Sequence, residues 1–297
     1  MPSYHIGTLD EEGRIALSGE EVQPDADAKP GPTFLRPKNW KKAILHSKRT
    51  TSWDTRIFTF KLEHDDQTIG LPTGQHLMIR LRDPVTREAI IRSYTPISET
   101  YRKGYLDVLI KVYFKSETSA GGKMSQGLDS LPIGHFVDLK GPTGKFIYHG
   151  NGLVTINGEE RNISHFVMIC GGSGITPIFQ VFRSIMNDKN DKTRCTLLDG
   201  NRLVEDILCK QELDQFANDN LDRCKVIHTL TQPPDNWDGL RGRIAGALLA
   251  EHASKEVLGL GEIGQAMVLL CGPPALEKAA HKELLNQGWR DDELLFF

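Results

Sequence analysis

Residues 164–177 read SHFVMICGGSGITP, and this stretch decides how the sequence folds. Its first half is apolar without alternation, which is typical of a strand buried on both faces of a parallel sheet. A glycine-rich turn follows, and beyond it apolar residues recur at helical spacing, at Ile178, Val181, Phe182, Ile185 and Met186. The stretch therefore predicts a strand, a turn and a helix in succession.

The same alternation continues toward the C-terminus. Further strands are predicted at 194–198, 225–230, 266–271 and 294–297, and helices at 204–217, 244–252 and 275–286. Strands that alternate with helices form a parallel sheet covered on both faces, so we expect residues 164–297 to be an α/β domain with a parallel sheet. Ligands of such sheets bind beyond the carboxyl ends of the strands.

Residues 35–148 show a different pattern. Short strands are predicted at 56–62, 76–81, 90–96, 106–114 and 136–140, separated by turns rich in Gly, Pro and Asp, with one helix after Gly122. Many short strands with a single helix predict a closed antiparallel Greek-key β-barrel. Residues 1–34, rich in acids, Ala and Pro, are expected to be a linker, and residues 149–163 are expected to connect the two domains.

Composition excludes several classes of protein. The chain has 36 basic and 39 acidic residues, so it lacks the excess of positive charge that a nucleic-acid binder carries. Five cysteines without C-x-x-C and ten histidines without H-E-x-x-H argue against a disulfide framework and a bound metal. Apolar runs are too short to cross a bilayer, and no secretory signal is visible. We therefore expect a cytoplasmic protein that binds no nucleic acid, membrane or metal.

The glycine turn at 171–174 is the first candidate binding site. Glycines let backbone amides approach a ligand, and the N-terminus of the following helix favours a negative group. Thr176 is expected to cap this helix and Pro177 to be its first residue. A phosphate site and an ordinary capped turn are both compatible with the segment.

Three shorter segments are further candidates. In RSYTP, at 92–96, the Arg92 guanidinium suits a phosphate and the Tyr94 ring suits a flat ring system. GGKMS, at 121–125, opens a helix and is a second possible anion site. In CGPP, at 271–274, a strand turns sharply into a helix, which places the Cys271 thiol at the carboxyl edge of the sheet. Each segment is also compatible with a plain turn or strand end.

The order of these motifs carries more information than any one of them. R-x-Y-T-P, I-K-V-Y-F, G-G-K-M-S, G-P-T-G-K-F, C-G-G-S-G-I-T-P and C-G-P-P follow one another between residues 92 and 274. Over residues 37–297 the chain resembles the NADH-cytochrome b5 reductase family of the ferredoxin-NADP reductase-like flavoproteins. YHIGTLD, at 4–10, and the Pro-rich stretch after it are similar to the segments that follow the cytochrome b5 domain in eukaryotic assimilatory nitrate reductases. The chain thus resembles the C-terminal flavin reductase portion of such enzymes.

The resemblance implies a function and two cofactors. Hydride would pass from NADPH, with NADH as a weaker donor, to FAD, and single electrons would then pass to a cytochrome b5-type haem domain. Haem b and the molybdenum cofactor would belong to parts absent from this chain, and oligomerisation would depend on those parts. A free-standing NAD(P)H-cytochrome b5 reductase is the alternative, and a non-catalytic nucleotide-binding module is an alternative of another class.

The resemblance also implies roles for individual residues. Those expected to bind FAD are Arg92, Ser93, Tyr94, Thr95, Leu109, Ile110, Lys111, Val112, Tyr113, Phe114, Lys123, Met124 and Ser125. Those expected to bind the dinucleotide are Gly171, Gly172, Ser173, Gly174, Cys271, Gly272 and Pro273, while Thr176 would approach the flavin from the second domain. Cys271, Thr95 and Thr176 would lie against the reacting rings, where Cys271 would position the nicotinamide without forming a covalent bond.

The expectation of NADPH rests on Thr231. Relatives that use NADH carry an acid after the strand corresponding to 225–230, and an acid at this place accepts the ribose 2′-hydroxyl. Thr231 is neutral and would not repel a 2′-phosphate. Arg241 or Arg243 would bind that phosphate, with Arg202 contributing. The alternative is that these arginines are solvated surface charges.

Overall fold

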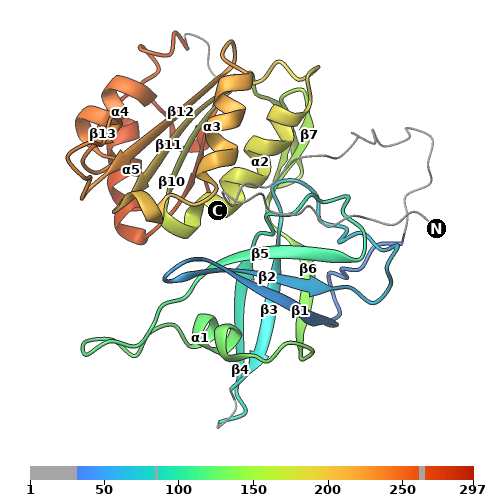
Figure 1. The fold of residues 1–297 in the computed structure, drawn as a ribbon. Coiled ribbons are helices and arrows are strands. Elements are labelled where there is room, and N and C mark those ends of the chain that lie inside the picture. Colours follow the sequence, from blue (N-terminus) through green and yellow to red (C-terminus); the bar gives the residue numbers. More distant parts are fainter. Residues whose placement is uncertain (1–31, 84–85, 261–264) are drawn as a thin grey trace. The chain divides into compact units, whose positions relative to one another are not determined.

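The computed structural model of the chain describes residues 32–83, 86–260 and 265–297, and two large sheets dominate them (Figure 1). Most of the predicted linker, including residues 4–10, lies outside the described residues. Phe34, at its end, is fully buried in the first domain, and Thr33 forms a β-bridge with Thr68. We therefore propose that the first domain begins by residue 33. No helix among the described residues is both long and apolar enough to cross a membrane.

The first domain is an antiparallel sheet with one helix, as the sequence predicts, and its sheet has six strands where five were predicted. The strands are β1 (Lys41–Ser52), β2 (Thr55–Lys61), β3 (His76–Arg82), β4 (Ala89–Tyr94), β5 (Tyr105–Lys111) and β6 (Phe136–Thr143), in the order β4-β3-β6-β1-β2-β5. After β4 the chain returns to β5, where the Ile97 amide donates to the Asp107 carbonyl. Helix α1 (Lys123–Ser130) packs on β3 and β4 and adds Met124 and Leu128 to the core.

Strand β1 is not among the predicted strands. Only Ala43 and Leu45 of its twelve residues are buried, and the rest of KKAILHSKRTTS is polar or exposed. The strand forms because it pairs with β2 on one side and with β6 on the other, and its own residues carry no apolar alternation.

The segment predicted to connect the domains also contains strands. Strands β7 (Phe146–Gly150), β8 (Leu153–Ile156) and β9 (Glu159–Asn162) form a small antiparallel sheet. β9 is charged and lacks the apolar alternation by which a strand is predicted. The Phe146 ring packs edge-on against Phe166 and Phe297 of the second domain, with centroid distances of 6.3 and 5.9 Å. We propose that 149–163 is an ordered connection.

The second domain is a parallel sheet. Its strands are β10 (His165–Gly171), β11 (Arg194–Asn201), β12 (Cys224–Leu230), β13 (Leu240–Arg241), β14 (Ala266–Cys271) and β15 (Leu294–Phe296), in the order β13-β12-β11-β10-β14-β15. Helices α2 (Ile175–Asn187) and α3 (Lys210–Asp219) cover one face. Helices α4 (Gly246–Ala253) and α5 (Pro274–Asn286) cover the other (Figure 1). All seven residues of β10 are therefore buried.

Two details of the predicted helices are wrong. The helix expected at 204–217 is a short 3-10 turn, Val204–Asp206, followed by α3 from Lys210. Thr176 does not cap α2: the cap residue is Gly174, and the Thr176 hydroxyl donates to the Ser173 carbonyl at 3.3 Å. The glycine turn tightens into a 3-10 turn, Gly172–Gly174, so the helix starts earlier than its proline suggests.

Candidate functional site

The strand order creates a crevice at the carboxyl edge of the second sheet. β10 pairs with β11 on one side and with β14 on the other, so the chain leaves β10 and β14 in different directions. Ligands of open α/β sheets bind where the strand order switches in this way. The register places Cys170 beside Cys271 and brings the turn after β10 against the turn after β14. A Cβ atom on Gly174 would lie 2.2 Å from the Cys271 carbonyl oxygen, so only glycine permits this approach.

A cleft of about 930 Å³ extends from this crevice into the first domain. This volume lies at the upper end of the range for small-molecule sites, as a dinucleotide requires. Most of the predicted flavin and nicotinamide residues line it together: Arg92, Ser93, Tyr94, Thr95, Leu109, Ile110, Lys111, Tyr113, Lys123, Met124, Ser125, Gly171, Gly172, Ser173, Gly174, Thr176, Cys271, Gly272 and Pro273.

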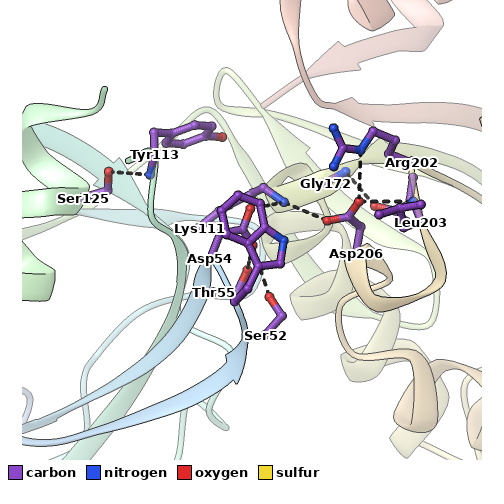
Figure 2. A network of polar contacts seen from close by, with 12 residues as sticks. Ser52, Asp54, Thr55, Lys111, Tyr113, Ser125, Gly172, Arg202, Leu203 and Asp206 are labelled. Atoms are coloured by element: carbon purple, nitrogen blue, oxygen red, sulfur yellow. Dashed lines mark hydrogen bonds and ion pairs between the residues drawn. The ribbon is translucent and has the colours of Figure 1, made fainter. Parts of the chain in front are cut away.

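The first-domain wall of the cleft is built by β4, β5 and the start of α1. The Arg92 side chain is exposed, with Nη1 on the Ile91 carbonyl at 2.7 Å, and Thr95 is buried. Burial raises the pKa of Tyr94 to about 12, despite the opposing charge of Arg92, so its phenol stays neutral. The Ser125 hydroxyl accepts a hydrogen bond from the Tyr113 amide at 3.1 Å and donates one to the Gly122 carbonyl (Figure 2). These two bonds hold the start of α1 beside the segment that follows β5.

Cys271 lies half-buried in the second-domain wall. Burial, with the charge of Glu277, raises the pKa of its thiol to about 12. A neutral thiol is a weak nucleophile, so this environment suits packing against a ligand and not covalent catalysis.

A second cleft of about 600 Å³ adjoins the first and shares Lys111, Gly171, Gly172 and Pro273 with it. Arg202, Thr231 and Arg243 all line this second cleft. Arg241 does not: it is exposed, and its Nη2 donates to the carbonyls of Pro234, Asp235 and Trp237 at 3.1–3.2 Å. Of the two candidate arginines, the structure therefore brings Arg243 to the cleft.

Lys111 joins the two domains at the edge of both clefts (Figure 2). Its ammonium lies 2.8 Å from Asp54 of the first domain and 3.1 Å from Asp206 of the second. Asp54 also accepts the hydroxyls of Ser52 and Thr55. Asp206 accepts the Leu203 amide, and Arg202 lies 4.0 Å from it. Burial opposes the charge of Lys111, but the two carboxylates outweigh burial and raise its pKa.

Two predicted flavin residues lie elsewhere, and several cleft residues were not predicted. Val112 is buried and Phe114 is exposed beside Trp53; both line a separate groove of about 560 Å³. They alternate along the chain with Lys111 and Tyr113, which do line the main cleft, so this alternation excludes Val112 and Phe114 from it. Cleft residues that the sequence did not point to include His76, Phe297, Trp53, Asp54, Asn201 and Asp206. Asn201 ends β11 at the carboxyl edge, a position that could have marked it.

Known proteins resemble this chain in both domains. Residues 42–148 match the oxidoreductase FAD-binding domain family and residues 168–282 the oxidoreductase NAD-binding domain family. The chain is 54% identical to the NADPH nitrate reductase of Aspergillus niger over 297 residues, covering all of this chain and 33% of that protein. It is 36% identical to NADH nitrate reductase 1 of Zea mays, over 93% of this chain and 46% of that protein.

A solved structure decides the family. The cytochrome b5 reductase domain of Ulva prolifera nitrate reductase superposes with a TM-score of 0.82 at 34% identity, covering 89% of this chain and all of that one. The chain belongs to the family of nitrate reductase cytochrome b5 reductase domains. This reductase domain is an NAD(P)H-dependent FAD oxidoreductase with a two-domain fold. It spans about a third of the length of the fungal nitrate reductases that it matches.

The residues of this reductase domain fit both cofactors chemically. The main cleft offers a guanidinium and an ammonium, Arg92 and Lys123, for a pyrophosphate, and the Tyr94 ring for a flat ring system. The second cleft offers Arg202 and Arg243 for a phosphate. Among the described residues, no three His, Cys, Asp or Glu side chains gather as a metal site would need.

We expect Arg92→Ala to purify with much less FAD than the wild type. The substitution removes a charge-assisted phosphate contact, which contributes about 1.5–3 kcal/mol. The ratio of flavin absorbance to protein absorbance measures this. Arg87→Ala, a change on the turn before β4, is the control and should keep the wild-type ratio. Full FAD content in Arg92→Ala would show that Arg92 does not bind the pyrophosphate.

We expect Cys271→Ser to fold and keep FAD but to lose about 10- to 100-fold in the rate of flavin reduction by NADPH. Small displacements of the reacting atoms are costly, and serine is shorter and better hydrated than cysteine. Rapid-mixing absorbance measures this rate directly. Cys209→Ser, whose thiol lies outside both clefts, serves as the control. Equal rates in Cys271→Ser and the wild type would leave Cys271 with a packing role only.

Proposed function

We propose that this domain oxidises NADPH, reduces its FAD and passes electrons singly to a cytochrome b5-type haem. The observation that carries the proposal is the pair of adjoining clefts. One has the residues for a flavin, the other has two arginines and the neutral Thr231, and both meet at the glycine turn.

The residues of each cleft then have distinct tasks. Arg92, Lys123 and the α1 amides hold the FAD pyrophosphate, while Tyr94 and Thr95 border the ring system. A bound flavin supplies the chemistry, since it accepts a hydride and releases electrons one at a time. Gly171–Gly174, Thr176 and the segment from Cys271 to Pro273 orient the nicotinamide and keep water away from it.

The second cleft supports NADPH as the donor. Arg202 and Arg243 give a 2′-phosphate two cationic partners, and Thr231 adds no negative charge to repel it. The Aspergillus niger relative, at 54% identity, is named an NADPH enzyme, whereas the Zea mays relative, at 36%, is named an NADH enzyme.

The relatives support the partner. The fungal proteins that match over the whole chain are nitrate reductases, which favours the reductase portion of such an enzyme over a free-standing cytochrome b5 reductase. We propose that a haem domain of the same protein is the acceptor, that haem b and the molybdenum cofactor sit in other parts, that assembly depends on those parts, and that the protein works in the cytoplasm.

Steady-state kinetics test the proposal. The FAD-loaded protein is given NADPH or NADH, with ferricyanide or a purified cytochrome b5 as acceptor. We expect reduction of both acceptors and a higher kcat/KM with NADPH. A preference for NADH contradicts the choice of donor, and failure to reduce cytochrome b5 while ferricyanide is reduced contradicts the choice of acceptor.

A further inference from the structure

A line of polar side chains lies behind the glycine turn, between β11, β12 and α3. It consists of Asn201 and Asp199 on β11, His228 on β12 and Asp214 on α3. Asn201 lines the second cleft, whereas the clefts are lined by neither Asp199 nor His228. Any effect of His228 on a ligand must therefore pass through its neighbours.

His228 is held between two carboxylates. Its Nδ1 lies 3.1 Å from Asp199 Oδ2 and its Nε2 lies 3.1 Å from Asp214 Oδ1. An ionised carboxylate only accepts hydrogen bonds, so both contacts are hydrogen bonds when the ring is an imidazolium. Burial of the ring opposes this charge, but Asp199 and then Asp214 outweigh burial and raise the pKa of His228.

Asp199 needs a cation beside it, because only 1% of its surface is exposed. His228 supplies this charge at Oδ2. The other oxygen, Oδ1, accepts the Asn201 amide nitrogen at 2.9 Å and the Cys170 thiol at 3.4 Å. Since Asn201 Nδ2 donates to Asp199, the amide oxygen of Asn201 is turned the opposite way.

That oxygen accepts the Gly172 amide at 3.3 Å. Gly172 has a φ of 55°, in the left-handed region, and it lines both clefts at their junction. A fixed partner for its amide holds the turn in this conformation.

We infer that His228 is a positioning residue for the dinucleotide: its charge maintains the Asp199 carboxylate, Asp199 orients Asn201, and Asn201 holds Gly172 in the turn that receives the phosphates. This rests on the proposed function, in which the turn binds NADP(H). The other groups near these two carboxylates are Lys210, paired with Asp214, and the thiols of Cys170, which donates to Asp199, and Cys209, which is also near Arg183. Burial raises the pKa of both thiols, which favours their neutral form.

The first test is direct binding of NADP⁺ and NAD⁺ to the FAD-loaded protein by calorimetry. His228→Gln should weaken both by about 3- to 10-fold, because the pyrophosphate is common to them. FAD content should not change, and KM for NADPH should rise more than kcat falls. His281→Gln is the control, since His281 lies on α5 and forms an exposed pair with Asp291 of the following turn. A lower unfolding temperature with unchanged dissociation constants would overturn the inference and leave His228 a structural residue.

The second readout is pH. The protonated ring is the form that supports binding, so affinity should fall as pH rises through the raised pKa of His228. His228→Gln should remove this fall and His281→Gln should keep it. An identical pH profile in the wild type and His228→Gln would overturn the inference.

The third readout is a double-mutant cycle with Asn201→Ala. If His228 acts only through Asn201, the double variant should bind NADP⁺ as weakly as Asn201→Ala alone. If the double variant instead loses affinity by the product of the two single losses, the two residues affect NADP⁺ binding independently, and the inference is overturned. A wild type that binds only NAD⁺ would contradict the proposed donor instead, and the same cycle would then be read with NAD⁺.

Discussion

Lys111→Met should lower the free energy of unfolding by about 3–5 kcal/mol, because it leaves Asp54 buried without a cation and Asp206 with only Arg202 at 4.0 Å. Asp54 is 3% exposed and Asp206 is 8% exposed, and Lys111 is within 3.1 Å of both. Methionine keeps most of the length of the side chain but removes the ammonium, with its charge and its hydrogen-bond donors. Urea denaturation of the FAD-saturated protein measures the change.

A matched control separates burial from charge. Lys61, on β2 of the same sheet, forms an exposed pair with Asp65. Lys61→Met should lower the free energy of unfolding by no more than about 0.5 kcal/mol. Adding Asp54→Asn to Lys111→Met should recover part of the loss, since asparagine Oδ1 still accepts the hydroxyls of Ser52 and Thr55. A loss below about 1 kcal/mol in Lys111→Met would show that water solvates these carboxylates.

Arg243→Ala should lower kcat/KM for NADPH by about 10- to 100-fold and change that for NADH by less than about 3-fold. The reason is the loss of a hydrogen bond between a cation and the 2′-phosphate, which contributes about 1.5–3 kcal/mol. NADH lacks that phosphate and so lacks the contact. Steady-state kinetics with both donors measure the two values.

Arg241→Ala is the matched control, because Arg241 is two residues away and bonds loop carbonyls outside the clefts. Arg241→Ala should keep the wild-type ratio of kcat/KM for NADPH to kcat/KM for NADH. Thr231→Asp, in the same cleft as Arg243, should shift the preference toward NADH, since it repels the phosphate and accepts a 2′-hydroxyl. Equal losses with both donors in Arg243→Ala would mean that this arginine binds a part that NADPH and NADH share.

Patterns along the chain predicted the second domain well. The apolar run in β10, the glycine turn and the 3.6-residue spacing in α2 are all local, so each element could be predicted without knowing its neighbours. Local patterns did not predict β1 and β9, whose residues are mostly polar or exposed. These two segments form strands because partner strands are available.

The candidate site divides in the same way. The chemical groups that are available, and their order, follow from the sequence: a guanidinium and a tyrosine before the glycine turn, a cysteine after it, and arginines near Thr231. Only the tertiary structure decided that Arg243 and not Arg241 lines the second cleft. It alone joined Lys111 to Asp206, 95 residues away, and placed His228 behind the turn. Motifs record local backbone preferences, whereas a contact between distant side chains depends on strand order and register, which no single segment encodes.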